Sequence, residues 1–334
     1  MQKIALLNNK KLLFPLPPEP TSSNEDLQAL HAKYPFLNSW YLEVHMRDDW
    51  EKAKDFFNKQ WVFYEEFADK NFLTEIQTNF SQRAWEIYLS YLFQENSLVQ
   101  ISQSKNSPNP DFKIKLNDNQ NIFVEAVVAG KGEGVNAVET LSDKLSLVPS
   151  GTIISGGESI DSSNHPKVRR ILSALNEKGR GFQANYRKVT TENDYFVIAV
   201  NAGDIDGSRM PEGLILEAVW GMNPALHLPR LSDGTFGPAY QTLRPSILNS
   251  RSTASIDLDF FRRDEYKEIS GVIFSGSDVV NTILQEKTNE EIIFVHNPNA
   301  LPNKTIPMSV FNFLTQITIS PTGWTRHPSI IKES

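Results

Sequence analysis

The chain has 334 residues, of which 40% are hydrophobic and 22% charged, and its formal net charge is −7. This composition is ordinary for a globular protein with a core of its own, while the acidic balance excludes a generic polyanion binder. Any contact with nucleic acid would therefore need a local basic patch. Because the chain contains no cysteine, disulfides, cysteine nucleophiles and thiolate metal sites are excluded as well.

The first twenty residues, MQKIALLNNKKLLFPLPPEP, contain no long apolar run followed by small residues, so we expect no signal peptide. No later stretch approaches the roughly 18 to 20 apolar residues of a membrane span. We therefore expect a cytoplasmic protein with no membrane partner.

The N-terminal part of the chain has a helical pattern. After a Pro- and Ser-rich lead-in at 15–24, a short helix is expected from Glu25 to about Lys33, where Pro35 ends it. From Asp48 to Phe93, apolar residues recur at three- and four-residue spacing, which predicts further helices. The last of these is almost entirely apolar, so we expect it to be buried.

Strands dominate the next part. The segments 98–103, 112–116 and 122–128 have the character of short strands, and the continuous apolar run 195–201 predicts a strand buried on both faces. A Gly- and Ser-rich acidic segment at 130–161 precedes a helix that is expected from Pro166 to about Lys188, with Asn164 as its cap. Further strands or buried segments are expected at 213–220, 270–276 and 290–298.

This order of elements predicts an α/β fold with a mixed sheet. We expect a helical N-terminal extension at 1–75, packed on one domain at 76–334. The alternative is two separate domains divided near residue 205.

Two carboxylates occur in the expected hairpin 112–128. With 117–121 as its turn, Lys113 lies opposite Glu125 and Asp111 lies opposite Val127, all on one face. Side chains directly opposed on one face are about 5 Å apart at Cβ, so both carboxylates can reach one cation. Carboxylates favour Mg²⁺ or Mn²⁺, which can activate water for phosphodiester hydrolysis. The alternative is an ordinary half-solvated hairpin, with Asp111 as a turn residue.

Glu86 is a possible third acid. It lies in the middle of the apolar helix, where a charge is costly unless it is paired or bound to a metal ion. Alternatively, it belongs to a narrow polar stripe that faces water, formed with Gln82, Ser90 and Gln94 at a spacing of four residues.

Several segments in order, RAWEIYLSYLF, PDFKIKL, FVEAVVA, a helix and YFVIAVN, resemble the PD-(D/E)XK phosphodiesterase superfamily. The closer likeness is to an uncharacterised bacterial branch, through ILSALNEK, SGVIFSG and FVHNPNALP, and it spans roughly residues 75 to 305. The resemblance implies a restriction-endonuclease-like core (helix, three strands, helix, strand). It also implies an Mg²⁺- or Mn²⁺-dependent nuclease with Glu86, Asp111 and Glu125 as metal ligands.

Val127 stands where that superfamily usually has a lysine, which would position water and neutralise developing charge. Lys113, on the face of Glu125, is one candidate replacement. Lys178 is another, because it flanks the apolar stripe of the expected helix 166–188 and other branches of the superfamily supply the lysine from this helix. The third possibility is that nothing replaces it.

The same helix provides the local basic patch that the overall charge requires. Its only acid is Glu177, and the residues expected to contact phosphates are Lys167, Arg169, Arg170 and Arg180. The alternative is a solvated helix face that balances the acidic segment before it.

Together these features predict a metal-dependent nuclease, with DNA as the expected substrate and a partner protein or homodimer as a further possibility. The alternative is a catalytically inactive nuclease-like module that binds nucleic acid or a partner protein in a bacterial defence or modification system. His296, followed by Asn-Pro, is expected to form a structural turn rather than a site.

Overall fold

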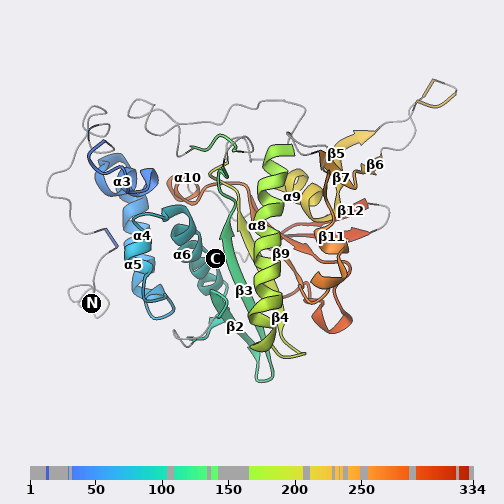
Figure 1. The fold of residues 1–334 in the computed structure, drawn as a ribbon. Coiled ribbons are helices and arrows are strands. Elements are labelled where there is room, and N and C mark those ends of the chain that lie inside the picture. Colours follow the sequence, from blue (N-terminus) through green and yellow to red (C-terminus); the bar gives the residue numbers. More distant parts are fainter. Residues whose placement is uncertain are drawn as a thin grey trace.

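The fold is α/β, with one mixed eight-stranded sheet that carries helices on both faces (Figure 1). The computed structural model describes residues 13–14, 29, 32–103, 109–133, 137–141, 165–205, 211–227, 230–232, 234–235, 240–248, 255–285, 291–320 and 323–330. The expected cap Asn164, most of the expected helix 25–33 and most of the segment 130–161 lie outside these residues.

The order of strands in the main sheet is β1 (Val99–Gln100), β2 (Phe112–Asn117), β3 (Gln120–Val128), β4 (Tyr195–Asn201), β9 (Gly271–Ser275), β10 (Ile292–His296), β11 (Thr315–Ser320) and β12 (Gly323–His327). The first six lie in segments where strands or buried segments were predicted, whereas β11 and β12 were not predicted. Pairing is antiparallel from β1 to β3 and parallel from β3 through β4 to β9. Because β4 pairs directly with β9, the sheet is continuous across residue 205, where the two-domain alternative divides the chain.

The helices fall into two layers. One face of the sheet carries α3 (Ser39–Met46), α4 (Glu51–Tyr64), α5 (Phe72–Glu75), α6 (Phe80–Glu95) and α10 (Val279–Leu284). The other carries α8 (His165–Ala184) and α9 (Pro211–Trp220). In β3, Val124 and Ala126 join the first core, whereas Phe123 and Val127 join the second. The alternation predicted for this strand is therefore confirmed.

Two short ribbons complete the described fold outside the main sheet. They are β5 (Met222–His227) with β6 (Tyr240–Leu243), and β7 (Ser246–Leu248) with β8 (Ser255–Asp257). Within the described part of the chain, no helix combines the length and apolar character that crossing a bilayer requires.

The predicted register of the β2–β3 hairpin is wrong by two residues. Lys113 pairs with Phe123, not with Glu125. The turn is shorter than the five residues assumed, because Asn117 pairs with Gln120 and its Oδ1 accepts a hydrogen bond from Asn119 N (3.0 Å). Asparagine favours such tight local turns. A shift of two residues keeps every side chain on its predicted face, since the strand period is two.

Two other expectations need correction. Segment 213–220 lies in helix α9 rather than in a strand, although it is buried as expected. The basic helix ends at Ala184 and is followed by a 3₁₀ turn at Tyr186–Lys188, so it is shorter than predicted.

Candidate active site

The candidate site lies where β3 extends beyond its partner β2. The last β2–β3 pair is Phe112 with Val124, so among the described residues no strand pairs with the following backbone groups of β3 on that side. Side chains take its place. Asp111 Oδ2 accepts from Ala126 N (2.7 Å), and the amide of Gln82 both accepts from Val128 N (2.9 Å) and donates to Ala126 O (3.2 Å).

Glu125 lies on this stretch of β3, on the face that α8 covers. Its Oε1 accepts from Lys178 Nζ of α8 (2.8 Å) and from the hydroxyl of Tyr186 just beyond that helix (3.3 Å). The residue is only 4% exposed, and its Oε2 is buried without a hydrogen-bond partner. An acceptor left in this way costs free energy that a bound donor or cation would recover.

The charges at this point do not balance. Burial and the neighbouring Glu125 raise the pKa of Asp111 to about 8, against the opposing effect of Lys178. Burial likewise raises the pKa of Glu125, although Lys178 opposes the shift. Burial acts to lower the pKa of Lys178, but the carboxylates outweigh it and raise that pKa above the usual value. Two carboxyl groups therefore share one ammonium, and the excess negative charge calls for a proton or a cation.

Glu86 belongs to a different network on α6. Both its oxygens accept from Arg83 Nη1 (3.1 and 2.9 Å), and they also accept from Gln82 (2.9 Å) and Tyr64 (3.2 Å). Burial, together with Asp111, raises the pKa of Glu86 to about 7 in spite of Arg83. With an exposed fraction of 2%, Glu86 does not lie on a water-facing stripe, so that alternative is wrong.

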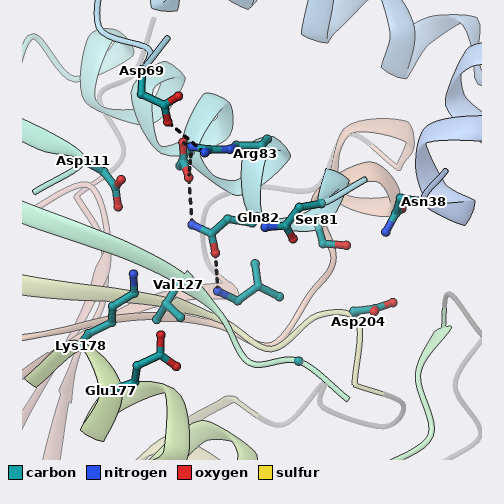
Figure 2. Close-up of a pocket in the computed structure, with 14 residues that line it drawn as sticks. Asn38, Asp69, Ser81, Gln82, Arg83, Asp111, Val127, Glu177, Lys178 and Asp204 are labelled. Atoms are coloured by element: carbon teal, nitrogen blue, oxygen red, sulfur yellow. Dashed lines mark hydrogen bonds and ion pairs between the residues drawn. The ribbon is translucent and has the colours of Figure 1, made fainter. Parts of the chain in front are cut away.

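A cavity of about 500 Å³ opens between α6 and the β3–α8 side of the molecule. Figure 2 shows Asp111 and Lys178 toward one end and Asn38 and Asp204 toward the other. Its charged lining consists of two cations, Arg83 and Lys178, and five acids, Asp69, Glu86, Asp111, Glu177 and Asp204. The cavity is therefore polar and predominantly acidic.

The donor set fits a cation held by two protein carboxylates. Within the described ranges, no group of three or more His, Asp or Glu side chains is placed to hold a metal ion, and Glu86 is occupied by Arg83. Asp111 and Glu125 remain as the two candidate ligands. The Oε2 atom of Glu125 is buried without a hydrogen-bond partner, and the neighbouring carboxyl groups carry excess negative charge. Mg²⁺ is commonly bound through one or two carboxylates, several waters and substrate phosphates, so two carboxylates suffice.

The two candidate lysines are placed very differently. Lys178 lies at the cavity beside Glu125, as expected for a residue that flanks the buried stripe of α8. Lys113 instead lies with its Nζ 5.5 Å from the ring centroid of Phe123, because the register brings that ring opposite it. The structure thus brings Lys178, and not Lys113, to the carboxylates.

The basic residues of α8 do not form one exposed patch. Arg169 is only 8% exposed, whereas the predicted contact with phosphate requires an accessible guanidinium. Arg170 donates to Gly130 O (2.8 Å) and ties the segment after β3 to the helix. Lys167 is half-buried and Arg180 is exposed. Only part of the predicted surface is therefore available to a ligand.

His296 is buried and shares a hydrogen bond with Gln316 (2.8 Å), and Asn297 donates to Ile269 O (2.8 Å). These contacts agree with the structural turn expected here. Sequence reasoning missed two residues at the site. Gln82 lies four residues before Glu86 on the same helical face, so helical spacing was the signal available for it. Tyr186 lies in the 3₁₀ turn beyond α8, and no spacing in the sequence pointed to it.

No family model, curated protein or solved structure matches this chain in comparison.

Proposed function

We propose that this protein is a metal-dependent nuclease with a restriction-endonuclease-like core, which hydrolyses phosphodiester bonds of nucleic acid. The observation that carries the proposal is the ion pair between Lys178 and the buried Glu125, next to a polar cavity that Lys178 and Asp111 line. A cation on α8 stands at the carboxylates, although position 127 of the strand is valine.

The order of elements supports the same proposal. Helix α6 is followed by the antiparallel strands β1, β2 and β3, then by α8 and by β4, which is parallel to β3. This is the order of helix, three strands, helix and strand that the resemblance implies. It brings the acid before β2, the acid within β3 and the lysine of α8 to one end of β3.

Each residue has a distinct role in the proposed reaction. Asp111 and Glu125 would hold Mg²⁺ or Mn²⁺, which when bound polarises a phosphate oxygen and lowers the pKa of water. Lys178 keeps its proton at neutral pH because its pKa is raised, so it acts by neutralising charge rather than as a base. Tyr186 and Lys178 both donate to Oε1 of Glu125 and so orient that carboxylate.

In the proposed reaction, Glu86 does not bind the metal ion and acts only through neighbouring residues. It accepts a hydrogen bond from Gln82, and Gln82 in turn connects α6 to the edge of β3 through Ala126 and Val128. We assign it to the positioning of that edge, and not to the metal ligands implied by the resemblance.

The second candidate function is a catalytically inactive nuclease-like module that binds nucleic acid or a partner protein. The acidic lining of the cavity, and the lack of a three-ligand metal cluster among the described residues, favour it. The two functions differ in metal-dependent cleavage and in divalent-cation binding at Asp111 and Glu125.

The test compares wild type with Asp111→Asn for cleavage of circular and single-stranded DNA and of RNA, in Mg²⁺, Mn²⁺ or EDTA. Calorimetric titration with Mn²⁺ supplies a readout that is independent of turnover. Asp118→Asn is the matched control, because Asp118 is an exposed acid on the turn of the same hairpin. We expect metal-dependent cleavage and Mn²⁺ binding that Asp111→Asn abolishes and Asp118→Asn retains. Folded wild-type protein that neither cleaves nor binds Mn²⁺ would exclude the nuclease.

A further inference from the structure

An exposed aromatic turn lies directly beside the far end of the cavity. Phe36 is 67% exposed, and its ring meets that of Tyr34 edge-on at 6.2 Å, while Lys33 Nζ lies 5.1 Å from the Tyr34 centroid. Two residues after Phe36, Asn38 lines the cavity. The turn therefore adjoins the end of the cavity that Asn38 lines, and it carries one cation and two aromatic rings.

This turn is held in place by backbone and cap contacts. Leu37 N donates to Tyr34 O (3.0 Å), Asn38 N donates to Gln77 O (2.8 Å), and Asn38 Oδ1 caps α3 by accepting from Trp40 N (2.9 Å). Large hydrophobic side chains are otherwise rarely exposed in the described part of the chain, and the others are aliphatic. An exposed aromatic ring in a fixed turn is a platform on which a planar group can stack.

The size and charge of the cavity restrict what can pass from this turn to the carboxylates. About 500 Å³ is the size of a site for one small organic ligand, which is enough for a nucleotide and too little for stacked base pairs. Five acids against two cations also repel a dense row of phosphates. A duplex carries one charge per roughly 1.7 Å of its axis and a single strand about half of that, so the single strand is repelled less.

One wall between the two ends is the start of α6, where Ser81, Gln82 and Arg83 line the cavity. No acidic residue occurs in the first turn of this helix, and Arg83 adds a cation. A backbone phosphate that follows this wall therefore meets less repulsion than one beside the acids of the lining, and the following base arrives at the aromatic turn.

We propose that the substrate is single-stranded nucleic acid. It runs along the cavity from the carboxylate–lysine end past Asn38, and it stacks a base on Phe36. This inference rests on the proposed function, because it names the substrate class of that site. Every base can stack on an aromatic ring, so we expect the protein to distinguish single strands from duplexes and not one base sequence from another.

The test measures binding by fluorescence anisotropy in Mg²⁺, with Asp111→Asn as the background so that bound strands stay intact. The probes are labelled twelve-residue oligothymidylate and oligouridylate, and a blunt duplex of the same length. We expect the single strands to bind more tightly than the duplex. Phe36→Ala should raise the single-strand Kd about tenfold, because one stacked base is lost, and Phe36→Trp should retain wild-type affinity.

Ile330→Ala is the matched control, because Ile330 is 65% exposed and does not line the cavity. Equal or tighter binding of the duplex, or an unchanged Kd in Phe36→Ala, would overturn the inference. Its failure is separable from that of the proposed function. Phe36-dependent binding without metal-dependent cleavage removes only the nuclease, whereas cleavage that is indifferent to Phe36 and to strandedness removes only this inference.

Discussion

Replacing Lys178 by methionine removes the only cation that contacts Glu125 in the described structure. At 2.8 Å and an effective dielectric constant of about 20, the attraction in this pair is about 6 kcal/mol. Desolvation offsets part of it, and the Lys178 side chain is 23% exposed, so we expect a loss of about 3 kcal/mol in the free energy of unfolding. Glu125→Gln in the same chain should recover most of this loss, since the buried charge is then gone.

The loss should depend on pH. Both carboxyl groups already have folded-state pKa values above their usual range, and losing the ammonium raises them further. A carboxyl group with a raised folded-state pKa does not destabilise the protein at low pH. The free energy of unfolding then falls as the pH rises through that folded-state pKa. Lys178→Met should therefore be more destabilised at pH 8 than at pH 5.

The assay is urea unfolding at both pH values in EDTA, combined into a double-mutant cycle for Lys178 and Glu125. Lys115→Met is the control, because Lys115 and Asp118 form an ion pair of the same 2.8 Å length on an exposed turn. We expect almost no effect there. If Lys178→Met costs no more than this control, or costs the same at pH 5 and pH 8, the reasoning from burial is refuted.

Two further predictions concern the edge of β3. Gln82→Ala removes three hydrogen bonds, to Glu86, Ala126 and Val128. It should lower the free energy of unfolding by about 2 kcal/mol, measured by urea unfolding. It should also weaken Mn²⁺ binding, measured by calorimetry. Unchanged Mn²⁺ affinity in a folded variant would argue against a positioning role. In EDTA, wild type should lose stability between pH 5 and pH 8, because the pKa of Asp111 is raised to about 8. Asp111→Asn should lose less and should exceed wild type at pH 8 by at least about 1.4 kcal/mol, the equivalent of one pKa unit, whereas parallel pH curves would contradict this.

Much of the fold could be predicted because its signals are local. The apolar run 195–201 and the segments at 271–275 and 292–296 are strands, as their residue types indicate. Segment 213–220 was ambiguous, because a short apolar run has no period that separates a buried strand from a buried helix. Which strands pair across the sheet depends on long-range packing, and the pattern alone does not contain it.

The candidate site shows the same division. The side of the strand on which Glu125 lies follows from the two-residue period and holds even though the register was wrong, since an even shift preserves facing. The choice between Lys113 and Lys178 could not follow from periodicity, because it depends on how α8 crosses β3. The burial of Arg169 could not be predicted from the sequence either, since a cationic residue in an amphipathic helix can border either the buried or the exposed face.

The edge of β3 has a consequence for how substitutions at this site should be interpreted. An unpaired strand edge is a template for another chain, and proteins protect such edges with side chains or covering elements. Here the groups that satisfy the amides of Ala126 and Val128 are Asp111 and Gln82, which also line the cavity. The geometry of the candidate site and resistance to intermolecular strand addition thus depend on the same two side chains. Substitutions that remove their hydrogen-bonding atoms should favour self-association, while isosteric ones should leave the protein monodisperse.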